Sequence, residues 1–262
     1  MQYDSPLLTG KLIKRYKRFL ADIELDCAGR EGEIITAHCA NTGAMTHCAD
    51  EGCRVWLWDS NNPKRKLPIS WEWTTVTTDA GQYKACVNTA RANQLVHETL
   101  LQQLEQASTA GEHWLAGYTS VRKEPKVEDG RLDFCLHGEG MADFYIEVKS
   151  LTLPRIDIKP GLGCFPDART ERGLKHLQRL LALKQQGHRT ALLFCVSLEG
   201  IEQVAAAADV DPDYAAALDQ IREGGVEVMA WPVRFDLPAN SMTLQPERAL
   251  PVLESGQYPL NK

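Results

Sequence analysis

The stretch Arg131-Leu132-Asp133-Phe134-Cys135-Leu136, together with Phe144-Tyr145-Ile146-Glu147-Val148-Lys149, decides the fold of the second half of this chain. Both segments have the length and the apolar content of β-strands. Residues two apart on a strand share a face, so Glu147 and Lys149 point to one layer while Ile146 and Val148 point to the other. If the two strands pair, Asp133 lies beside Glu147 and Lys149.

An aspartate beside a Glu-x-Lys strand is the pattern of the PD-(D/E)xK nuclease core, whose carboxylates hold magnesium near a phosphodiester. Two carboxylates about 4 Å apart repel by roughly 4 kcal/mol at an effective dielectric near 20, so a cation is expected beside them. We expect Asp133 and Glu147 to ligate Mg²⁺ or Mn²⁺. Lys149 would position the attacking water or stabilise charge on the phosphate. The same pattern also fits a surface hairpin with a salt bridge.

The length and composition of the chain limit the classes of protein to which it can belong. The chain has 262 residues, of which 44% are hydrophobic and 24% charged, and this size favours two modest domains. We expect a nucleic-acid-binding domain over residues 1–87 and a nuclease-like domain over 88–262. No run of eighteen apolar residues and no export signal is present, which predicts a cytoplasmic protein with no membrane partner. The eight scattered cysteines fit reduced core positions in that compartment.

The first 87 residues consist of short period-two segments separated by turns, which predict a five-stranded OB-like barrel. The expected strands are 12–25, 33–39, 54–59, 69–77 and 82–87. The net charge of −6 comes from the later part, because acidic and basic side chains balance over the first 88 residues. Two basic clusters are expected to contact phosphates, although solvated surface charges are the simpler alternative. They are Lys14, Arg15, Lys17 and Arg18 in the first strand, and Lys64, Arg65 and Lys66 in a turn.

The second part alternates helices and strands in the order of the nuclease core. Asn88 is a suitable N-cap for a helix that runs to about residue 107. Strands are expected at 114–127, 131–136 and 144–151, followed by a helix that begins near Asp167 or Thr170 and ends at Gly187. A strand at 190–198, a helix at 212–221 and a strand at 226–235 complete the predicted domain.

Three further groups are weaker site candidates. Glu98 on the first helix could be a third carboxylate of the site, or an ordinary exposed helix charge. Arg172, Lys175 and His176 lie where the next helix begins and could receive a phosphate, with His176 also a candidate catalytic residue, or they could belong to a well-capped amphipathic helix. Zinc is not supported, because the spacings of the neighbouring histidines and cysteines match no zinc pattern. These residues are His38, Cys39, His47, Cys48 and Cys53.

Several strings of the sequence also resemble a known family, the sugar fermentation stimulation protein A family. They are Cys39-Ala40-Asn41-Thr42-Gly43-Ala44-Met45-Thr46, Asn62-Pro63-Lys64-Arg65-Lys66, Val87-Asn88-Thr89, Glu147-Val148-Lys149 and the segment from Phe165 to Leu177. The resemblance runs from about residue 7 to 231. It implies a bacterial or archaeal cytoplasmic protein with an OB-like and a nuclease-like domain, described as DNA-binding and linked to regulation of sugar metabolism, notably maltose. Gly130 and Ser150 depart from the family pattern, which often has Ser and Asn there, without removing a carboxylate or the lysine.

Together these features predict a DNA-binding protein with a magnesium-dependent endonuclease or exonuclease site. The alternative is a non-catalytic DNA-binding regulator of transcription that retains the nuclease fold. RNA stays open as a partner, because OB-like barrels accept either nucleic acid. The chain lacks a phosphate-binding Gly-x-x-x-x-Gly-Lys loop and a Gly-x-Ser-x-Gly elbow, so nucleotide hydrolysis and serine esterase chemistry are not supported. The sequence leaves the oligomeric state open, a homodimer included.

Overall fold

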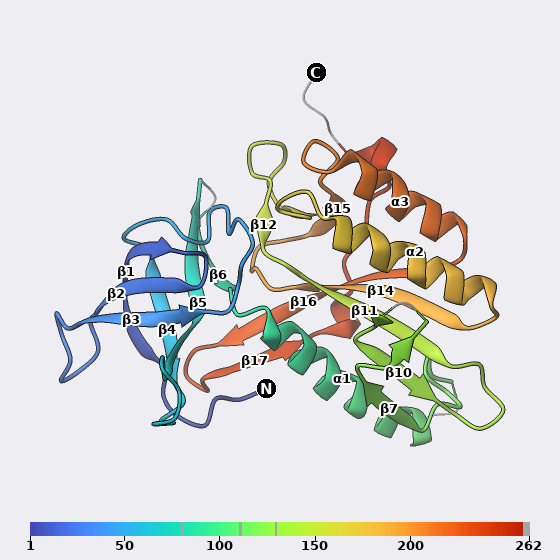
Figure 1. The fold of residues 1–262 in the computed structure, drawn as a ribbon, viewed down its shortest axis with the longest axis horizontal. Helices are drawn as coiled ribbons and strands as arrows, with labels where there is room; N and C mark the ends of the chain where they lie inside the picture. The colour runs from blue at the N-terminus through green and yellow to red at the C-terminus, as the bar shows by residue number, and fades with distance from the viewer. Residues whose placement is uncertain (80, 110–111, 129, 259–262) are drawn as a thin grey trace.

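The protein has an N-terminal β-barrel and a C-terminal α/β domain, which lie side by side in Figure 1. The structure is a computed structural model that describes residues 1–79, 81–109, 112–128 and 130–258. The predicted mixed α/β class is confirmed. Among the residues described, no helix combines the length and the apolar character that a membrane crossing requires.

Five strands in the described ranges close the barrel, as predicted. The barrel region contains β1 (Leu8–Tyr16), β2 (Leu20–Leu25), β3 (Ile34–Cys39), β4 (Arg54–Asp59), β5 (Ile69–Thr78) and β6 (Gly81–Cys86). Strand β1 pairs with both β2 and β4, and a short parallel contact between β3 and β5 completes the closure. Strand β6 pairs antiparallel with the later part of β5 and is not needed to close the barrel. Alternate residues such as Leu12, Ile23 and Trp71 fill the interior.

The prediction of one strand over residues 12–25 was wrong, because that segment is a hairpin. Strands β1 and β2 pair antiparallel around the turn Lys17–Arg18–Phe19. Lys17 and Arg18 both have left-handed backbone conformations, with φ of 49° and 65°. Such turns usually carry Gly, Asn or Asp, so two cationic residues give no turn signal in the sequence. The basic residues expected on one strand therefore divide between the strand and its turn.

The C-terminal domain is an α/β domain that has the predicted order of elements, followed by one strand that was not predicted. They are α1 (Ala90–Thr109), β7 (Ser120–Lys123), β10 (Phe134–His137), β11 (Phe144–Leu151), α2 (Glu171–Gln185), β14 (Arg189–Val196), α3 (Pro212–Glu223), β16 (Glu227–Asp236) and β17 (Ser241–Leu244). The sheet order is β17-β16-β14-β11-β10-β7, with β11, β14 and β16 parallel. The strand expected at 114–127 is shorter, because a turn through Gly117 precedes Ser120.

This domain also contains short elements that were not predicted from the sequence. They are β8 (Lys126–Val127), β9 (Gly130–Arg131), β12 (Leu153–Pro154), β13 (Leu162–Phe165), β15 (Gln203–Ala206) and the 3₁₀ turns η1 (Pro246–Arg248) and η2 (Ser255–Gln257). Strands β12, β13 and β15 form a small separate sheet beside the main one. Strand β13 thus lies between the strand predicted at 144–151 and the following helix, where no strand was predicted.

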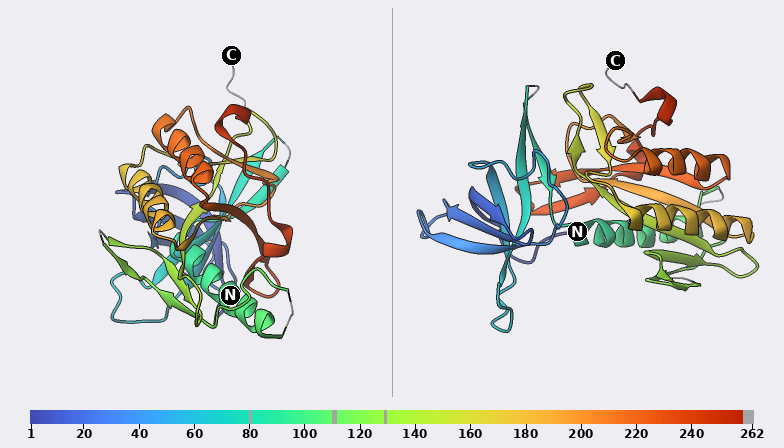
Figure 2. Two further views of the ribbon diagram at one scale, coloured as in Figure 1. Left: turned by 90° about the vertical axis from the view of Figure 1, so that its right-hand side faces the viewer. Right: turned by 45° about the horizontal axis from the view of Figure 1, so that its top comes forward.

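The helices cover the two faces of the main sheet. Helix α1 lies on one side and α2 with α3 on the other, as Figure 2 shows. Ile146 and Val148 pack in the hydrophobic cluster that includes α1. Tyr145 packs in the cluster formed with α2 and α3. The alternation along β11 therefore directs Glu147 and Lys149 toward the α2 side.

The barrel and the α/β domain share one hydrophobic core. Trp56 and Trp73 of the barrel belong to the same cluster of buried residues as α1 and the main sheet. The ring of Trp73 meets Phe235 of β16 edge to face, with centroids 5.3 Å apart. Burial of such rings contributes strongly to stability, so the two domains stabilise each other through this contact.

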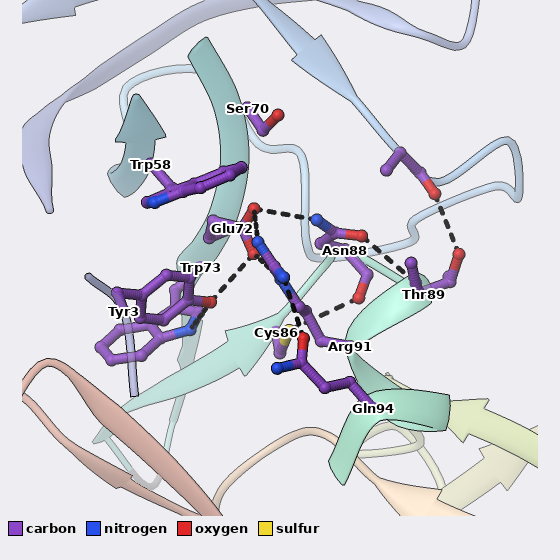
Figure 3. Close-up of polar contacts among 12 residues, drawn as sticks. Tyr3, Trp58, Ser70, Glu72, Trp73, Cys86, Asn88, Thr89, Arg91 and Gln94 are labelled. Carbon is purple, nitrogen blue, oxygen red and sulfur yellow. Dashed lines mark hydrogen bonds and ion pairs between the residues drawn. The ribbon is translucent and has the colours of Figure 1, made fainter. Parts of the chain in front are cut away.

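A buried ionic network joins the barrel to the start of α1 (Figure 3). The Glu72 carboxylate on β5 is fully buried. It accepts hydrogen bonds from Nε and Nη2 of Arg91 at 2.8 and 3.0 Å, from the Tyr3 hydroxyl at 2.9 Å and from Nδ2 of Asn88 at 2.9 Å. A buried carboxylate is tolerated when it is paired and hydrogen-bonded in this way. The network therefore fixes where α1 begins relative to β5.

Candidate active site

Four of the five residues predicted for the catalytic site, all except Glu98, meet in a cavity of about 560 Å³ at the junction of the two domains. They are Asp133, Glu147, Lys149 and His176, and Arg172, which was predicted to contact a phosphate, lines the cavity with them. They come from the bend before β10, from β11 and from the first turns of α2. The barrel contributes Asn41 and α1 contributes Asn93, so five parts of the fold surround the cavity.

Asp133 lies in a bend just before β10 rather than on a strand, which corrects the sequence prediction. Its Oδ2 accepts a hydrogen bond from the Val148 amide at 2.7 Å, and its Oδ1 accepts one from Nδ2 of Asn93 at 2.7 Å. Burial and the neighbouring charge of Glu147 raise the pKa of Asp133 to about 6. The site therefore holds two carboxylates close enough to repel.

Glu147 is almost completely buried and is held by two cationic or polar partners. Its Oε1 accepts a hydrogen bond from Nζ of Lys149 at 2.6 Å and also contacts Nδ1 of His176. Burial pushes the pKa of Glu147 upward, but the hydrogen bond from His176 and the charge of Lys149 outweigh it and lower that pKa. Glu147 thus stays ionised while Asp133 titrates near neutrality.

The His176 imidazole contacts both of the other groups, and its role as donor or acceptor depends on which ring nitrogen carries hydrogen. Nδ1 lies 3.1 Å from Nζ of Lys149 and also contacts the Glu147 carboxylate. It can donate to Glu147 only when it carries a proton, and accept from Lys149 only when it does not. The three side chains therefore form a group within which a proton can move.

The donor set fits a small divalent cation. Mg²⁺ keeps several waters and is usually bound through one or two carboxylates, a requirement that Asp133 and Glu147 meet. Burial, together with the charge of Glu147, raises the pKa of Asp133, and a cation bound beside the carboxylate would favour its ionised form. Within the described residues no cluster of three or more His, Cys, Asp or Glu side chains is arranged to hold a metal. An ion here would therefore depend on two carboxylates, water and substrate oxygens.

A barrel loop forms one wall of the cavity. The loop after β3 contributes Asn41, and its Met45 amide donates to Oδ2 of Asp167 at 3.3 Å. A Cβ atom on Gly43 would lie 2.6 Å from the same carboxylate oxygen, so any other residue there would require the Asp167 side chain to move. Asp167 precedes α2 and also lines the cavity. The barrel is therefore part of the site and not merely adjacent to it.

Other predicted site residues lie elsewhere. The Glu98 carboxylate contacts the amino group of Met1 at 2.8 Å and accepts from Gln94, and it does not line the cavity. Lys175 lines a different cavity beside Tyr145, on the outer part of α2. The third-carboxylate role expected for Glu98 therefore has no geometric support.

The basic clusters of the barrel have mixed surroundings. The Arg15 guanidinium donates to main-chain carbonyls, among them those of Arg18, Asn41 and Gly43. Lys14 lies 3.7 Å from a carboxylate oxygen of Asp22. In the turn between β4 and β5, Lys64 and Lys66 are exposed, whereas Arg65 donates to Ser70.

Several polar residues of the cavity were not predicted from the sequence, among them three that make contacts described above. Asn93, Asn41 and Asp167 are polar residues that carry no recognisable spacing relative to the Glu-x-Lys strand. The position of Asn93 one helical turn from Val96, on the face of α1 that meets the sheet, could have indicated it. For Asn41 and Asp167 no local signal exists, because they meet across the domain junction.

Known proteins share both halves of this architecture. Residues 13–83 match the model of the SfsA N-terminal OB domain, and residues 90–239 match that of the sugar fermentation stimulation protein RE domain. A sugar fermentation stimulation protein homolog of Aeromonas salmonicida is 49% identical over 233 residues, 88% of this chain and 89% of that relative. One of Ectopseudomonas mendocina is 50% identical over 233 residues, 88% of this chain and 92% of the relative.

A solved structure has the same fold. The structure of Pyrococcus furiosus SfsA in complex with Ca²⁺ superposes with a TM-score of 0.77 and covers 97% of this chain and 98% of that one. The two sequences are 22% identical, so this likeness concerns the fold.

Proposed function

The chain belongs to the sugar fermentation stimulation protein family, and on that premise we propose that it is a DNA-binding protein with a divalent-metal-dependent nuclease site. The observation that carries the proposal is the convergence of Asp133, Glu147 and Lys149 in one cavity. The Pyrococcus furiosus relative with Ca²⁺ supports the use of a divalent ion, for which we propose Mg²⁺ or Mn²⁺.

Each residue of the cavity has a chemical role in this proposal. Asp133 and Glu147 would hold the ion, which would supply Lewis-acid activation of a phosphodiester. The ammonium of Lys149, 2.6 Å from Glu147, is placed to stabilise negative charge on the phosphate in the transition state. His176 contacts both Glu147 and Lys149 and can accept or return a proton. Arg172 at the start of α2 can contact a neighbouring phosphate.

The barrel would bind the nucleic acid that enters the cavity. Its exposed cations Lys17, Arg18, Lys64 and Lys66 can neutralise phosphates, and binding should weaken steeply with salt because counterions are released. We further propose that this binding underlies a role in regulating sugar metabolism.

The direct test is an assay of cleavage on single-stranded, duplex and branched DNA with Mg²⁺ or Mn²⁺. Cleavage is expected with either ion and should stop when the ion is chelated. DNA binding with no cleavage under any of these conditions would instead indicate the non-catalytic regulator. The closed contact of Glu147 with Lys149 and His176 would then explain the absence of cleavage.

The affinity for Mn²⁺ is expected to fall below about pH 6. The pKa of Asp133 is raised to about 6, so below that pH a proton occupies the carboxylate and competes with the ion. A single competing proton lowers affinity roughly tenfold per pH unit, and affinity should level off at higher pH. Calorimetric titration with Mn²⁺ at several values over roughly pH 5 to 8 measures this pH dependence of the affinity.

Asp133→Asn is the matched control for that titration. It removes the titrating oxygen, so Mn²⁺ should bind weakly and without this pH dependence. Wild-type affinity that stays constant through pH 6 would contradict the assignment of Asp133 as a ligand.

A further inference from the structure

Three loops of the barrel lie at the end that faces the cavity. In the strand register, Leu20 at the start of β2 pairs with His38 near the end of β3, and His38 pairs with Ser70 at the start of β5. The β1–β2 turn, the loop after β3 and the loop before β5 therefore meet at one end of the barrel. The loop after β3 carries Asn41, which lines the cavity.

Arg15 connects the β1–β2 turn to the cavity wall. Its Nη2 donates to the carbonyl of Arg18 at 2.9 Å, to that of Asn41 at 2.8 Å and to that of Gly43 at 3.0 Å. One nitrogen atom thus joins the turn and the loop that borders the cavity. Because main-chain oxygens occupy its guanidinium, Arg15 holds the turn in place instead of contacting a phosphate.

The turn presents an aromatic ring to solvent. Phe19 is 46% exposed, and among the large apolar side chains that the described residues expose it alone is aromatic. Its backbone is fixed, because the Phe19 carbonyl accepts a hydrogen bond from the Cys39 amide at 2.8 Å. An exposed ring on a fixed backbone offers a flat apolar face at low entropic cost.

Two cations precede this ring in the turn and lack partners of opposite charge among the described residues. Lys17 and Arg18 are exposed, and in the part of the chain that the structure describes neither forms an ion pair. Both keep left-handed conformations that cost free energy for residues other than glycine. Backbone strain of this kind concentrates at functional positions. A ring beside free cations is the arrangement on which unpaired bases stack while phosphates are neutralised.

We propose that the turn Lys17–Arg18–Phe19 binds unpaired bases of a strand that continues into the cavity. The inference rests on the proposed function and names its substrate class, a nucleic acid with a single-stranded segment. Bases in a duplex already stack on their neighbours and offer no free face to Phe19, whereas a single strand does. Arg15 keeps this stacking site in register with the cavity.

Phe19→Ala tests the stacking directly in a binding assay without metal, in which cleavage does not interfere. Affinity for an oligothymidylate of about fifteen nucleotides should fall roughly tenfold, as expected from loss of one base–aromatic contact. Affinity for an abasic oligomer of equal length and charge should not change. Phe19→Trp should restore binding, and Ile34→Ala should have no effect, since Ile34 is exposed at the opposite end of the barrel.

The outcomes separate this inference from the nuclease proposal. An equal loss of affinity for the abasic oligomer, or no loss for oligothymidylate, overturns the stacking role even if DNA is still cleaved. A wild-type protein that binds duplex but no single strand also overturns it while leaving nuclease activity untouched. Absence of nucleic-acid binding by the wild type would remove both proposals.

Discussion

Glu147→Gln is expected to lower metal-dependent cleavage by more than about 100-fold. Groups that merely orient metal ligands already cost roughly 10- to 100-fold when removed, and Glu147 would contact the ion itself. The change also leaves the Lys149 ammonium, now 2.6 Å from the carboxylate oxygen, without its charged partner. DNA affinity should stay within a few-fold, because the exposed barrel cations are unchanged. Single-turnover cleavage and fluorescence anisotropy on the same DNA give the two quantities.

Glu98→Gln is the matched control for this change. It is the same substitution in a carboxylate of α1 that lies outside the cavity and contacts Met1 and Gln94. Its cleavage rate should be close to that of the wild type. Equal loss in both variants, or full activity in Glu147→Gln, would refute the assignment of Glu147.

Arg91→Met is expected to destabilise the protein by about 3–5 kcal/mol, the range measured when one member of a buried ion pair is removed. The variant leaves the fully buried Glu72 carboxylate with only the Tyr3 hydroxyl and the Asn88 amide as donors. Urea denaturation at neutral pH measures the change in the free energy of unfolding. The helix that carries Asn93 begins at this network, so the loss should also disturb the hydrogen bond to Asp133.

The double variant Glu72→Gln with Arg91→Met separates buried charge from lost contacts. It should be more stable than Arg91→Met alone, because the uncompensated carboxylate is gone. Arg30→Met provides the comparison at the surface, where Arg30 pairs with the exposed Glu33 and its loss should change stability little. If Arg91→Met costs no more than Arg30→Met, the network does not hold the domains together.

The local patterns of the sequence predicted the elements around the site well. The alternation along residues 144–149 correctly indicated which side chains of β11 face each layer, because successive side chains of a strand point to opposite faces of the sheet. The order of helices and strands followed from periodicity and capping residues such as Thr170, which accepts from the Gly173 amide at the start of α2.

The sequence could not predict contacts between distant segments. The hydrogen bond between Asp167 and the Met45 amide joins residues far apart in the chain, and no local spacing encodes it. Glu98 was placed near the site from its spacing on α1, yet the rotation of that helix is set by the core and turns this carboxylate toward Met1. Asn93 occupies the position that Glu98 was expected to hold, as the α1 residue that meets Asp133.

The ribosome synthesises the barrel long before the C-terminal residues against which the barrel packs. Trp73 of the barrel packs on Phe235, and Tyr3 belongs to the same buried cluster as Met242. Both late residues emerge long after the barrel strands, and domains normally fold as units from the N-terminus during synthesis. The nascent barrel therefore exposes an aromatic surface until nearly all of the polypeptide has been translated, and during that interval it is a natural client for chaperones.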